Sequence, residues 1–372
     1  MQVTEPLLAM PGRRCQKGTR TIPVIRFMQP HDTMASMQFK PVSVVIPLYN
    51  KEKDVRRAIA SAFAQTYPPA EIIVVDDGST DRGADVVESL GDAHIRLERQ
   101  PNAGVSAARN RGIAMASSEL IAFLDADDEW MPDHLETIVH LCRTFPECQV
   151  FATSYMLRFD SHKHERLPIF RGIPYEPWEG VLEDYFGLAA SSDPPLWSSA
   201  VAATRTALQT IDGFPIGIPQ GEDLLTWARL AMRYKVAFCS KPSAVFWQPS
   251  FDDGQPTRRP EKVDLVAPGL LALLENAGEQ TRPALRRYIG LWHKMRGTMF
   301  LRLGDIESAR SELRCSWKFS GFQWRLAAYR ALAILPPELA RPSSGAIGRA
   351  QRLYRRAFGS CKSDATLPLS PA

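Results

Sequence analysis

Short apolar runs alternate with amphipathic stretches along the first half of the chain. Runs rich in β-branched residues, such as Val42–Leu48, predict buried strands. Between them apolar positions recur at helical spacing, as Val55, Ile59 and Phe63 do. The expected strands are residues 42–48, 72–75, 95–98, 120–124 and 149–154, and the expected helices are residues 52–65, 79–90, 105–116 and 132–144.

This alternation predicts the α/β class, with a mostly parallel sheet flanked by helices on both faces. Ligands of such sheets bind at the carboxyl ends of the strands. Polar residues follow each expected strand. The sequence therefore places a binding site along that edge of the sheet.

The later part of the chain is less regular and then helical. Residues 160–195 are rich in proline and aromatic residues, and residues 251–262 have the composition of a linker. "FLRLGDIESARSEL" weakly suggests one helical hairpin of tetratricopeptide type. Short strands are expected at residues 197–202, 236–239 and 244–247, and helices at residues 223–234, 291–315, 324–335 and 346–358.

These patterns divide the chain into three expected parts. Residues 1–40 form an N-terminal extension without ordered structure, residues 41–250 the α/β domain, and residues 251–372 a basic helical C-terminal region. No run of about 18 apolar residues is present, so no membrane-spanning helix is predicted. The first 40 residues lack a signal-peptide core. Six scattered cysteines without metal-ligand spacing suit a reducing compartment, and a cytoplasmic location is expected.

Charge is distributed unevenly along the chain. Residues 280–372 carry 17 Lys and Arg against 5 Asp and Glu, although the whole chain has a net charge of only +4. Such a tail suggests an anionic surface as partner, membrane or nucleic acid, while solvated basic helices are an equally good reading. Of the two surfaces we expect the inner face of a membrane, bound peripherally by residues 324–335 and 346–358.

Three strand ends carry groups that suit a nucleotide. Tyr49 can stack on a flat base, and a carboxylate such as Asp77 can accept from a base N–H or a ribose hydroxyl. Gly78 allows close backbone approach. Arg109 could reach a diphosphate as a bidentate donor. A turn with a helix cap would explain the "DDGSTD" stretch equally well, and a surface arginine would explain Arg109.

Acidic residues gather after the fourth strand. Asp125, Asp127 and Asp128 follow the apolar residues 120–124, where three carboxylates repel each other unless a cation neutralises them. A hard divalent cation, Mg²⁺ or Mn²⁺, shared with substrate phosphates would do so. An exposed acidic loop is the alternative. Asp223, with Glu222 before it, opens a later helix, where it could cap the helix or act as a base.

Five segments in this order resemble the family-two inverting glycosyltransferases of GT-A fold, across about residues 41–247. They read "VSVVIPLYNKE", "IIVVDDGSTD", "NAGVSAARNRGI", "IAFLDADDEW" and "IPQGEDLLTWARLA". The resemblance implies a metal-dependent transferase, hexosyltransferase in type, that moves sugar from a nucleotide-diphosphate sugar to an acceptor hydroxyl. The acceptor would be a glycan or glycolipid of the cell envelope or surface polysaccharide.

The resemblance also implies roles for single residues. Asp223 would be the general base, supported by Glu222, and the DxD-like motif would bind the metal through Asp127 and Asp128. Many relatives add a metal-binding histidine after the last strand, where this chain has Trp247 and Gln248, which puts a third protein ligand in doubt. The residues expected to hold the donor are Pro47, Tyr49, Asn50, Glu52, Asp76, Asp77, Asn102, Arg109 and Asp125.

Two rival functions stay open at this point. A nucleotidyltransferase would need a glycine-rich basic loop after the first strand, and "PLYNKEKD" contains no glycine. A noncatalytic nucleotide-sugar-binding protein is the other rival. The motifs GxSxG, HExxH, GxxxxGK[ST] and GxGxxG after a strand are absent, which disfavours several other enzyme classes.

Overall fold

The computed structural model describes residues 40–159, 164–174, 177–248 and 259–334. The expected N-terminal extension, the expected helix at residues 346–358 and most of the expected linker lie outside these residues. Within the described part no helix is long and apolar enough to span a bilayer.

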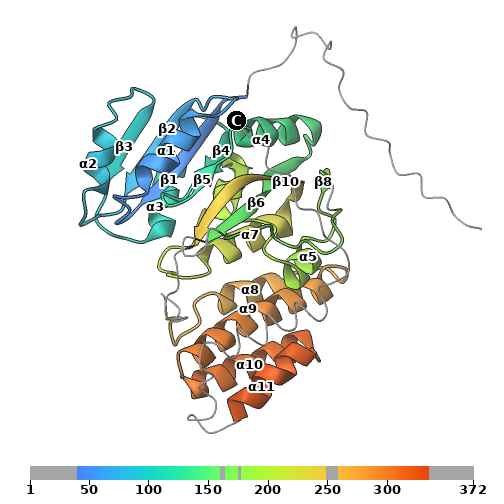
Figure 1. Ribbon diagram of the computed structural model, residues 1–372. Coiled ribbons are helices and arrows are strands. Elements are labelled where there is room, and N and C mark those ends of the chain that lie inside the picture. Colours follow the sequence, from blue (N-terminus) through green and yellow to red (C-terminus); the bar gives the residue numbers. More distant parts are fainter. Residues whose placement is uncertain (1–39, 160–163, 175–176, 249–258, 335–372) are drawn as a thin grey trace, which may run out of the picture. The chain divides into compact units, whose positions relative to one another are not determined.

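Ten strands form one sheet in the described part of the chain (Figure 1). The first strand has the bounds expected from its apolar run, and the next three differ by at most one residue at each end. The strands are β1 (Val42–Leu48), β2 (Glu71–Asp76), β3 (Ile95–Arg99), β4 (Leu120–Phe123), β5 (Glu129–Trp130), β6 (Cys148–Phe159), β7 (His164–Arg166), β8 (Glu179–Val181), β9 (Val201–Thr204) and β10 (Lys235–Gln248).

The sheet is mixed but mostly parallel along its N-terminal half. Its order is β3-β2-β1-β4-β9-β6-β10-β5, with β7 beside β6 and β8 beside β10. Strands β3, β2, β1 and β4 run parallel, and β9 is antiparallel to both of its neighbours. The carboxyl ends of β2, β1 and β4, with their polar loops, therefore share one edge.

Helices cover both faces of this sheet. Side chains of α1, α2 and α4 pack on one face with Val44 and Ile46 of β1. Those of α3, α5, α6 and α7 pack on the other face with Val45. The α/β class expected from the alternation is confirmed. The helices are α1 (Val55–Phe63), α2 (Gly83–Glu88), α3 (Val105–Met115), α4 (His134–Thr144), α5 (Tyr185–Ser191), α6 (Arg205–Thr210) and α7 (Glu222–Arg233).

Two expectations after residue 195 are wrong in detail. Ser198–Ala200 is a 3-10 turn and the strand begins only at Val201, because Ser199 is turned toward the acidic loop after β4. The two short strands expected at residues 236–239 and 244–247 are one strand, β10. Its register against β6 shifts around Pro242, which cannot donate to the ladder.

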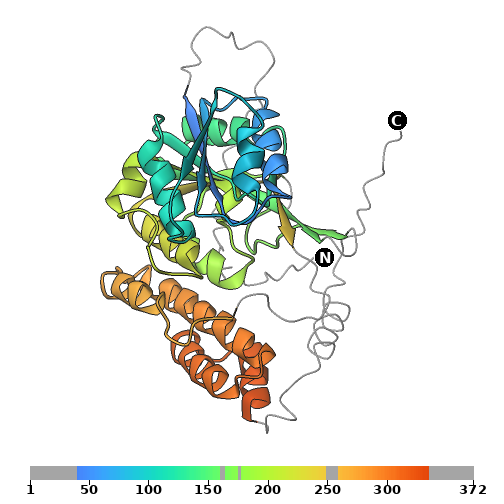
Figure 2. The same cartoon turned by 90° about the vertical axis from the view of Figure 1, so that its left-hand side faces the viewer.

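The helical region that follows contains α8 (Ala267–Glu275), α9 (Arg282–Arg302), α10 (Ile306–Ser320) and α11 (Trp324–Ile334). The single helix expected at residues 291–315 is wrong, because Gly304 has φ +76° and Asp305 caps a new helix by accepting from Ser308 N at 3.1 Å. The weak hairpin signal marked this turn correctly. Figure 2 shows α9 and α10 lying side by side.

Candidate active site

The loops after β1 and β2 are joined by hydrogen bonds. Asn50 has a left-handed backbone (φ +52°), and its Oδ1 accepts from Thr80 N at 2.8 Å and Asp81 N at 3.3 Å. Asn50 N donates to Ser79 Oγ at 3.0 Å. Asn50 thus holds the second loop against the first.

Residues around Asn50 extend this joint. Glu52 N donates to Asp81 Oδ2 at 2.8 Å, and Glu52 Oε2 accepts from Arg82 N at 3.2 Å. Pro47 is buried in β1, where it pairs with Val75. Tyr49 lies just beyond the strand and is 47% exposed. Its ring is available for stacking, whereas Pro47 and Glu52 shape the loop.

Asp77 organises the loop after β3. Its Oδ1 accepts from Gln100 Nε2 at 2.7 Å and Ala103 N at 2.9 Å, and its Oδ2 accepts from Gly104 N at 2.8 Å. The residue is only 3% exposed. This carboxylate therefore fixes the turn that leads into α3. Its expected contact with a nucleotide base would be a second role.

Gly78 marks a close approach between these two loops. Its φ is +70°, and a Cβ there would lie 2.7 Å from Asn102 N. Asp76 Oδ1 accepts from Ser79 N at 3.1 Å and so secures the same turn. Asn102 itself is exposed at this edge. The expected donor-binding residues of three loops are thereby held in one connected backbone framework.

Arg109 is held inside the protein by acidic residues, and the diphosphate contact expected for it stays a prediction. It is 3% exposed and lies between two acids from distant parts of the chain. Nη2 is 2.7 Å from Asp125 Oδ1 and Nη1 is 3.2 Å from Glu222 Oε1. The guanidinium also lies over the Phe214 ring, 5.0 Å from its centroid. Because it is buried and held by these contacts, Arg109 acts as a fixed counter-ion for the two acids.

Burial raises the pKa values of the two acids at the start of α7, Glu222 and Asp223. Burial and then Asp223 raise the pKa of Glu222 to about 7, although Arg109 acts in the opposite direction. Burial also raises the pKa of Asp223, again opposed by Arg109. Burial opposes the charge of Arg109, but Asp125 and Glu222 outweigh it and raise the pKa of the guanidinium. One cation thus faces three acids, Asp125 included.

Asp223 is half-buried at the start of α7. Its Oδ1 accepts from Leu224 N at 2.7 Å, so the helix start fixes its orientation. Gly221 precedes this pair with φ +82°. A carboxylate with raised pKa, placed by a rigid helix end, is suited to accept a proton.

Asp127 and Asp128 lie in different environments. Asp127 Oδ2 lies 2.6 Å from Lys51 Nζ, and the Asp127 side chain is 35% exposed. Asp128 is 1% exposed, and its Oδ2 accepts from Ser199 Oγ at 2.5 Å and Trp197 Nε1 at 3.3 Å. Burial, with the charges of neighbouring acids, raises the pKa of Asp128 well above its ordinary range. Asp128 is therefore buried and hydrogen-bonded, unlike a carboxylate that lies open to a metal ion.

Sequence reasoning missed two residues that organise this loop. Ser199 donates to Asp128 and its Oγ accepts from Asp125 N at 3.0 Å, so it ties both acids to the turn before β9. No short-range signal marks Ser199. Lys51 stands within the quoted "PLYNKE" segment, and its charge next to a strand end was the available signal.

Trp247 cannot replace a metal-binding histidine. Its ring is flanked by the guanidinium carbons of Arg57 and Arg158, at 4.5 and 4.8 Å from the centroid. Trp247 N donates to Asp128 Oδ1 at 3.2 Å. At this position, therefore, the loop that carries Asp128 is contacted by a tryptophan and its two flanking arginines.

A divalent ion fits these residues through Asp127. In the described part of the chain, no three-ligand group of His, Cys, Asp or Glu forms here. Mg²⁺ binds through one or two carboxylates, with phosphates and water completing its shell. Asp127 meets that requirement, with Asp125 two residues away, whereas the bonds of Asp128 turn it inward.

The structure brings the expected site residues together in three sets of contacts. Arg109 brings Asp125, Glu222 and the adjacent Asp223 together, although about a hundred residues separate the first acid from the others. Asp76 ends β2, Asp77 follows it directly, and Asn102 lies in the loop after β3. Lys51 connects the loop after β1 to Asp127.

Residues 43–187 match the model of the family described as Glycosyl transferase family 2. This stretch of the chain belongs to glycosyl transferase family 2. The expected membership, which rested on five motifs, is confirmed. The family match ends before Glu222 and Asp223, so the pair at the start of α7 lies outside it.

Curated relatives are similar to this chain over about a quarter of its length. The uncharacterized glycosyltransferase YibD of Escherichia coli is 45% identical over 100 residues, which cover 26% of this chain and 29% of the relative. The succinoglycan biosynthesis protein ExoW of Rhizobium meliloti is 46% identical over 100 residues, covering 25% and 31%. The matches therefore span less than a third of these relatives.

A solved structure supports the GT-A type of fold. Staphylococcus aureus TarS, residues 1–349 in complex with UDP-GlcNAc, superposes with a TM-score of 0.57 at 17% sequence identity. The superposition covers 83% of this chain and 92% of that one. It extends beyond the family match and shows that the fold is shared.

Proposed function

We propose that this chain is an inverting glycosyltransferase that moves a sugar from a nucleotide-diphosphate sugar to an acceptor hydroxyl. The observation that carries the proposal is the gathering of Asp125, Glu222 and Asp223 around Arg109 within a family 2 chain. Glu222 and Asp223 have raised pKa values, and acids of this kind are typical of sites that move protons.

Asp223 is proposed as the general base. It would take the proton of the acceptor hydroxyl while that oxygen attacks the anomeric carbon from the face opposite the diphosphate. The bond from the anomeric carbon to the phosphate oxygen breaks in the same step, through an oxocarbenium-like state. A single displacement of this kind inverts the configuration. Glu222 and Arg109 would hold Asp223 in place and set its proton affinity.

The donor diphosphate would lie near Asp127. Bound Mn²⁺ or Mg²⁺ would neutralise charge that develops on the leaving diphosphate. Lys51 pairs with Asp127 in the structure, so ion binding exchanges one cation for another at this carboxylate. Asp125, fixed by Arg109, would keep the loop in position.

The nucleotide would bind along the loops after β1, β2 and β3. Tyr49 is exposed enough to stack on a base, and Asp77, with Pro47 beside it, would line the base site. The solved TarS complex contains UDP-GlcNAc, and ExoW is named for succinoglycan biosynthesis. The first supports a nucleotide-sugar donor with a hexosyl group to transfer, and the second supports a surface polysaccharide as acceptor. A glycolipid is the other acceptor that we propose.

A donor panel tests the function. Each nucleotide sugar is added with Mn²⁺, and both the shift in Tm and the release of nucleotide diphosphate are measured. We expect one donor to raise Tm, since a ligand of the native state stabilises it, and to be slowly hydrolysed. Binding without any release, with acceptor extracts present, would favour a noncatalytic sensor. No binding of any nucleotide sugar would reject the proposal.

Peripheral attachment to an anionic leaflet is the accompanying proposal for the basic C-terminal region. Phe322 and Ile334 beside and within α11 are each 75% exposed. Cosedimentation of the full chain with anionic and with neutral vesicles at low salt tests it. Equal recovery with both kinds of vesicle would contradict it.

A further inference from the structure

Helix α9 packs directly on the backbone that precedes the Glu222–Asp223 pair. A Cβ built on Gly221 would lie 2.5 Å from Cη2 and 2.7 Å from Cζ3 of Trp292. Gly221 also has φ +82°, a conformation that L side chains rarely adopt. The indole of Trp292 therefore closes over the N-terminus of α7, where only glycine fits.

Tyr288, one turn earlier on α9, holds the other side of the pair. Its hydroxyl donates to Leu224 O at 3.1 Å, on the residue that directly follows Asp223. Tyr288 is 4% exposed, and its ring packs near Tyr185 and Phe186 of α5 at centroid distances of 6.1 and 5.5 Å. Contacts from α9 thus bracket the acids on both sides.

Trp292 is fixed in turn by Asp264. The indole Nε1 donates to both carboxylate oxygens, at 2.9 and 3.1 Å. The same carboxylate accepts from Val266 N at 3.0 Å and Ala267 N at 2.9 Å at the start of α8. Asp264 therefore connects the rotamer of Trp292 to the backbone of the next helix.

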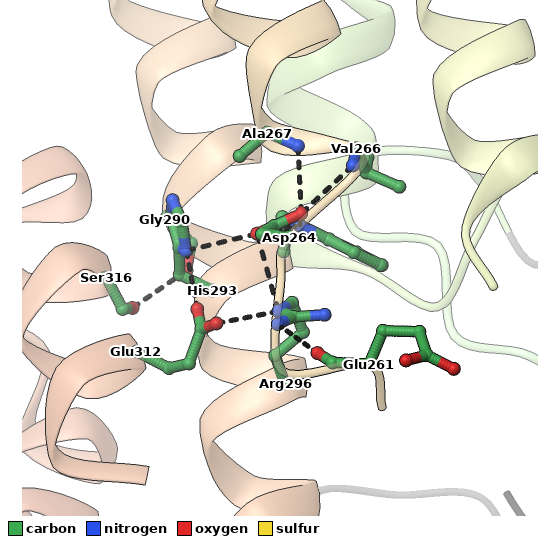
Figure 3. A network of polar contacts seen from close by, with 10 residues as sticks. Glu261, Asp264, Val266, Ala267, Gly290, His293, Arg296, Glu312 and Ser316 are labelled. Atoms are coloured by element: carbon green, nitrogen blue, oxygen red, sulfur yellow. Dashed lines mark hydrogen bonds and ion pairs between the residues drawn. The ribbon is translucent and has the colours of Figure 1, made fainter. Parts of the chain in front are cut away.

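A buried ion network anchors Asp264 (Figure 3). Glu312 of α10 accepts from Arg296 Nε at 2.7 Å and pairs with His293 Nδ1 at 2.7 Å. Arg296 Nε lies 3.4 Å from Asp264 Oδ2. The network joins α9, α10 and the segment before α8.

Asp264, His293 and Glu312 have the composition of a metal site, with ligand atoms within 4.8 Å of one another. Arg296 argues against that reading. Its permanently charged guanidinium contacts both carboxylates and is only 6% exposed in its side chain. A metal ion would have to displace this buried cation, so the cluster is better explained as a structural ion network.

We propose that α9 is a positioning element for Asp223, acting through Trp292 and Tyr288, with the Asp264 network holding Trp292 in place. The inference rests on the proposed transferase function of Asp223. Displacement of a base by about 1 Å can cost on the order of 100-fold in rate, so loss of this packing is expected to reduce turnover more than donor binding.

The test compares Trp292→Ala with Trp317→Ala in the full chain. Trp317 lies on α10 of the same hairpin and packs in a separate cluster with Phe300 and Leu313. We expect Trp292→Ala to lower kcat roughly 10- to 100-fold, with the donor KM within about twofold. The acid limb of its kcat–pH profile should move to lower pH, because Glu222 and Asp223 become better hydrated. Trp317→Ala should leave both quantities unchanged.

Amide hydrogen exchange at residues 221–225 provides a readout without activity. Exchange there should increase in Trp292→Ala and stay as in the wild type in Trp317→Ala. Trp292→Phe, which keeps a ring over Gly221, should lie between wild type and Trp292→Ala in both kcat and exchange. Unchanged exchange and an unchanged pH profile in Trp292→Ala would overturn the inference. If the wild type transfers no sugar, the proposed function fails, and exchange at residues 221–225 still decides whether Trp292 fixes this segment.

Discussion

Arg109 Nη2 lies 2.7 Å from Asp125 Oδ1, and this buried ion pair joins α3 to the loop after β4. The same guanidinium reaches Glu222 at the start of α7. Asp223 follows Glu222 directly, so three acids gather around one arginine whose side chain is only 3% exposed. The stability of the fold and the proposed proton transfer therefore depend on the same four side chains.

Replacement of Arg109 by Met is expected to destabilise the protein by about 3–5 kcal/mol, because it leaves acids without their buried counter-ion. Urea denaturation measures the change. Arg111→Met is the matched control on the same helix, since its pair with Glu98 is solvent-exposed and contributes at most about 1 kcal/mol. Equal losses for the two variants would contradict the assigned role of Arg109.

Glu222→Gln should stabilise the protein at pH 8 more than at pH 5. The pKa of Glu222 is raised from 4.5 to about 7 in the folded state. Its ionisation therefore costs folding stability as pH rises through this range, by up to about 3 kcal/mol. Tm against pH measures the effect, and Glu98→Gln at the surface is the control. A gain in Tm that is the same at both pH values would argue against this reading.

Asp223→Asn should retain donor binding and lower kcat at least ~100-fold, the usual scale for losing a general base. Wild-type kcat should also fall as the pH is lowered, because Asp223 becomes protonated. Since the pKa of Asp223 is raised, this fall should begin at a higher pH than it would for an ordinary aspartate. Initial rates with the donor found by the panel check both. Glu279→Gln, at an exposed position of the helical region, should behave as wild type. Near-normal turnover of Asp223→Asn would remove the residue from the role.

Asp127 and Asp128 should respond differently to metal. EDTA should abolish transfer and Mn²⁺ or Mg²⁺ restore it. Asp127→Asn should raise the Mn²⁺ concentration for half-maximal rate at least ~10-fold, since one charged ligand is lost. Asp128→Asn should change it little, because that side chain is buried on Ser199 and Trp197. Full activity in chelator would remove the ion from the reaction.

Gly78→Ala should destabilise the protein more than Gly91→Ala. Both glycines have positive φ, +70° and +61°, which costs a substituted alanine about 1–2 kcal/mol. Only at Gly78 would the new Cβ also meet backbone, 2.7 Å from Asn102 N, adding ~1–3 kcal/mol. Tm values of the two variants isolate that contact. An equal loss would show that the loops after β2 and β3 can separate freely.

Local patterning determined the order of elements in the first half of the chain. The bounds of Val42–Leu48 follow from one apolar run. Gly304 ends one helix, and Asp305 caps the next. These features depend on neighbours within a few residues, which is the range over which hydrophobic period and backbone conformation are encoded. The motifs of residues 41–247 likewise marked the family.

Only the tertiary structure decided what the charged side chains do. Local patterns assigned Arg109 to a diphosphate and Asp128 to a metal ion, whereas in the fold Arg109 pairs with Glu222, 113 positions away, and Asp128 with Ser199. Trp292 closes over Gly221 from a helix outside every motif. A charge buried in a low-dielectric interior takes the partners that folding brings to it, and those partners come from segments whose separation along the chain leaves no local signal.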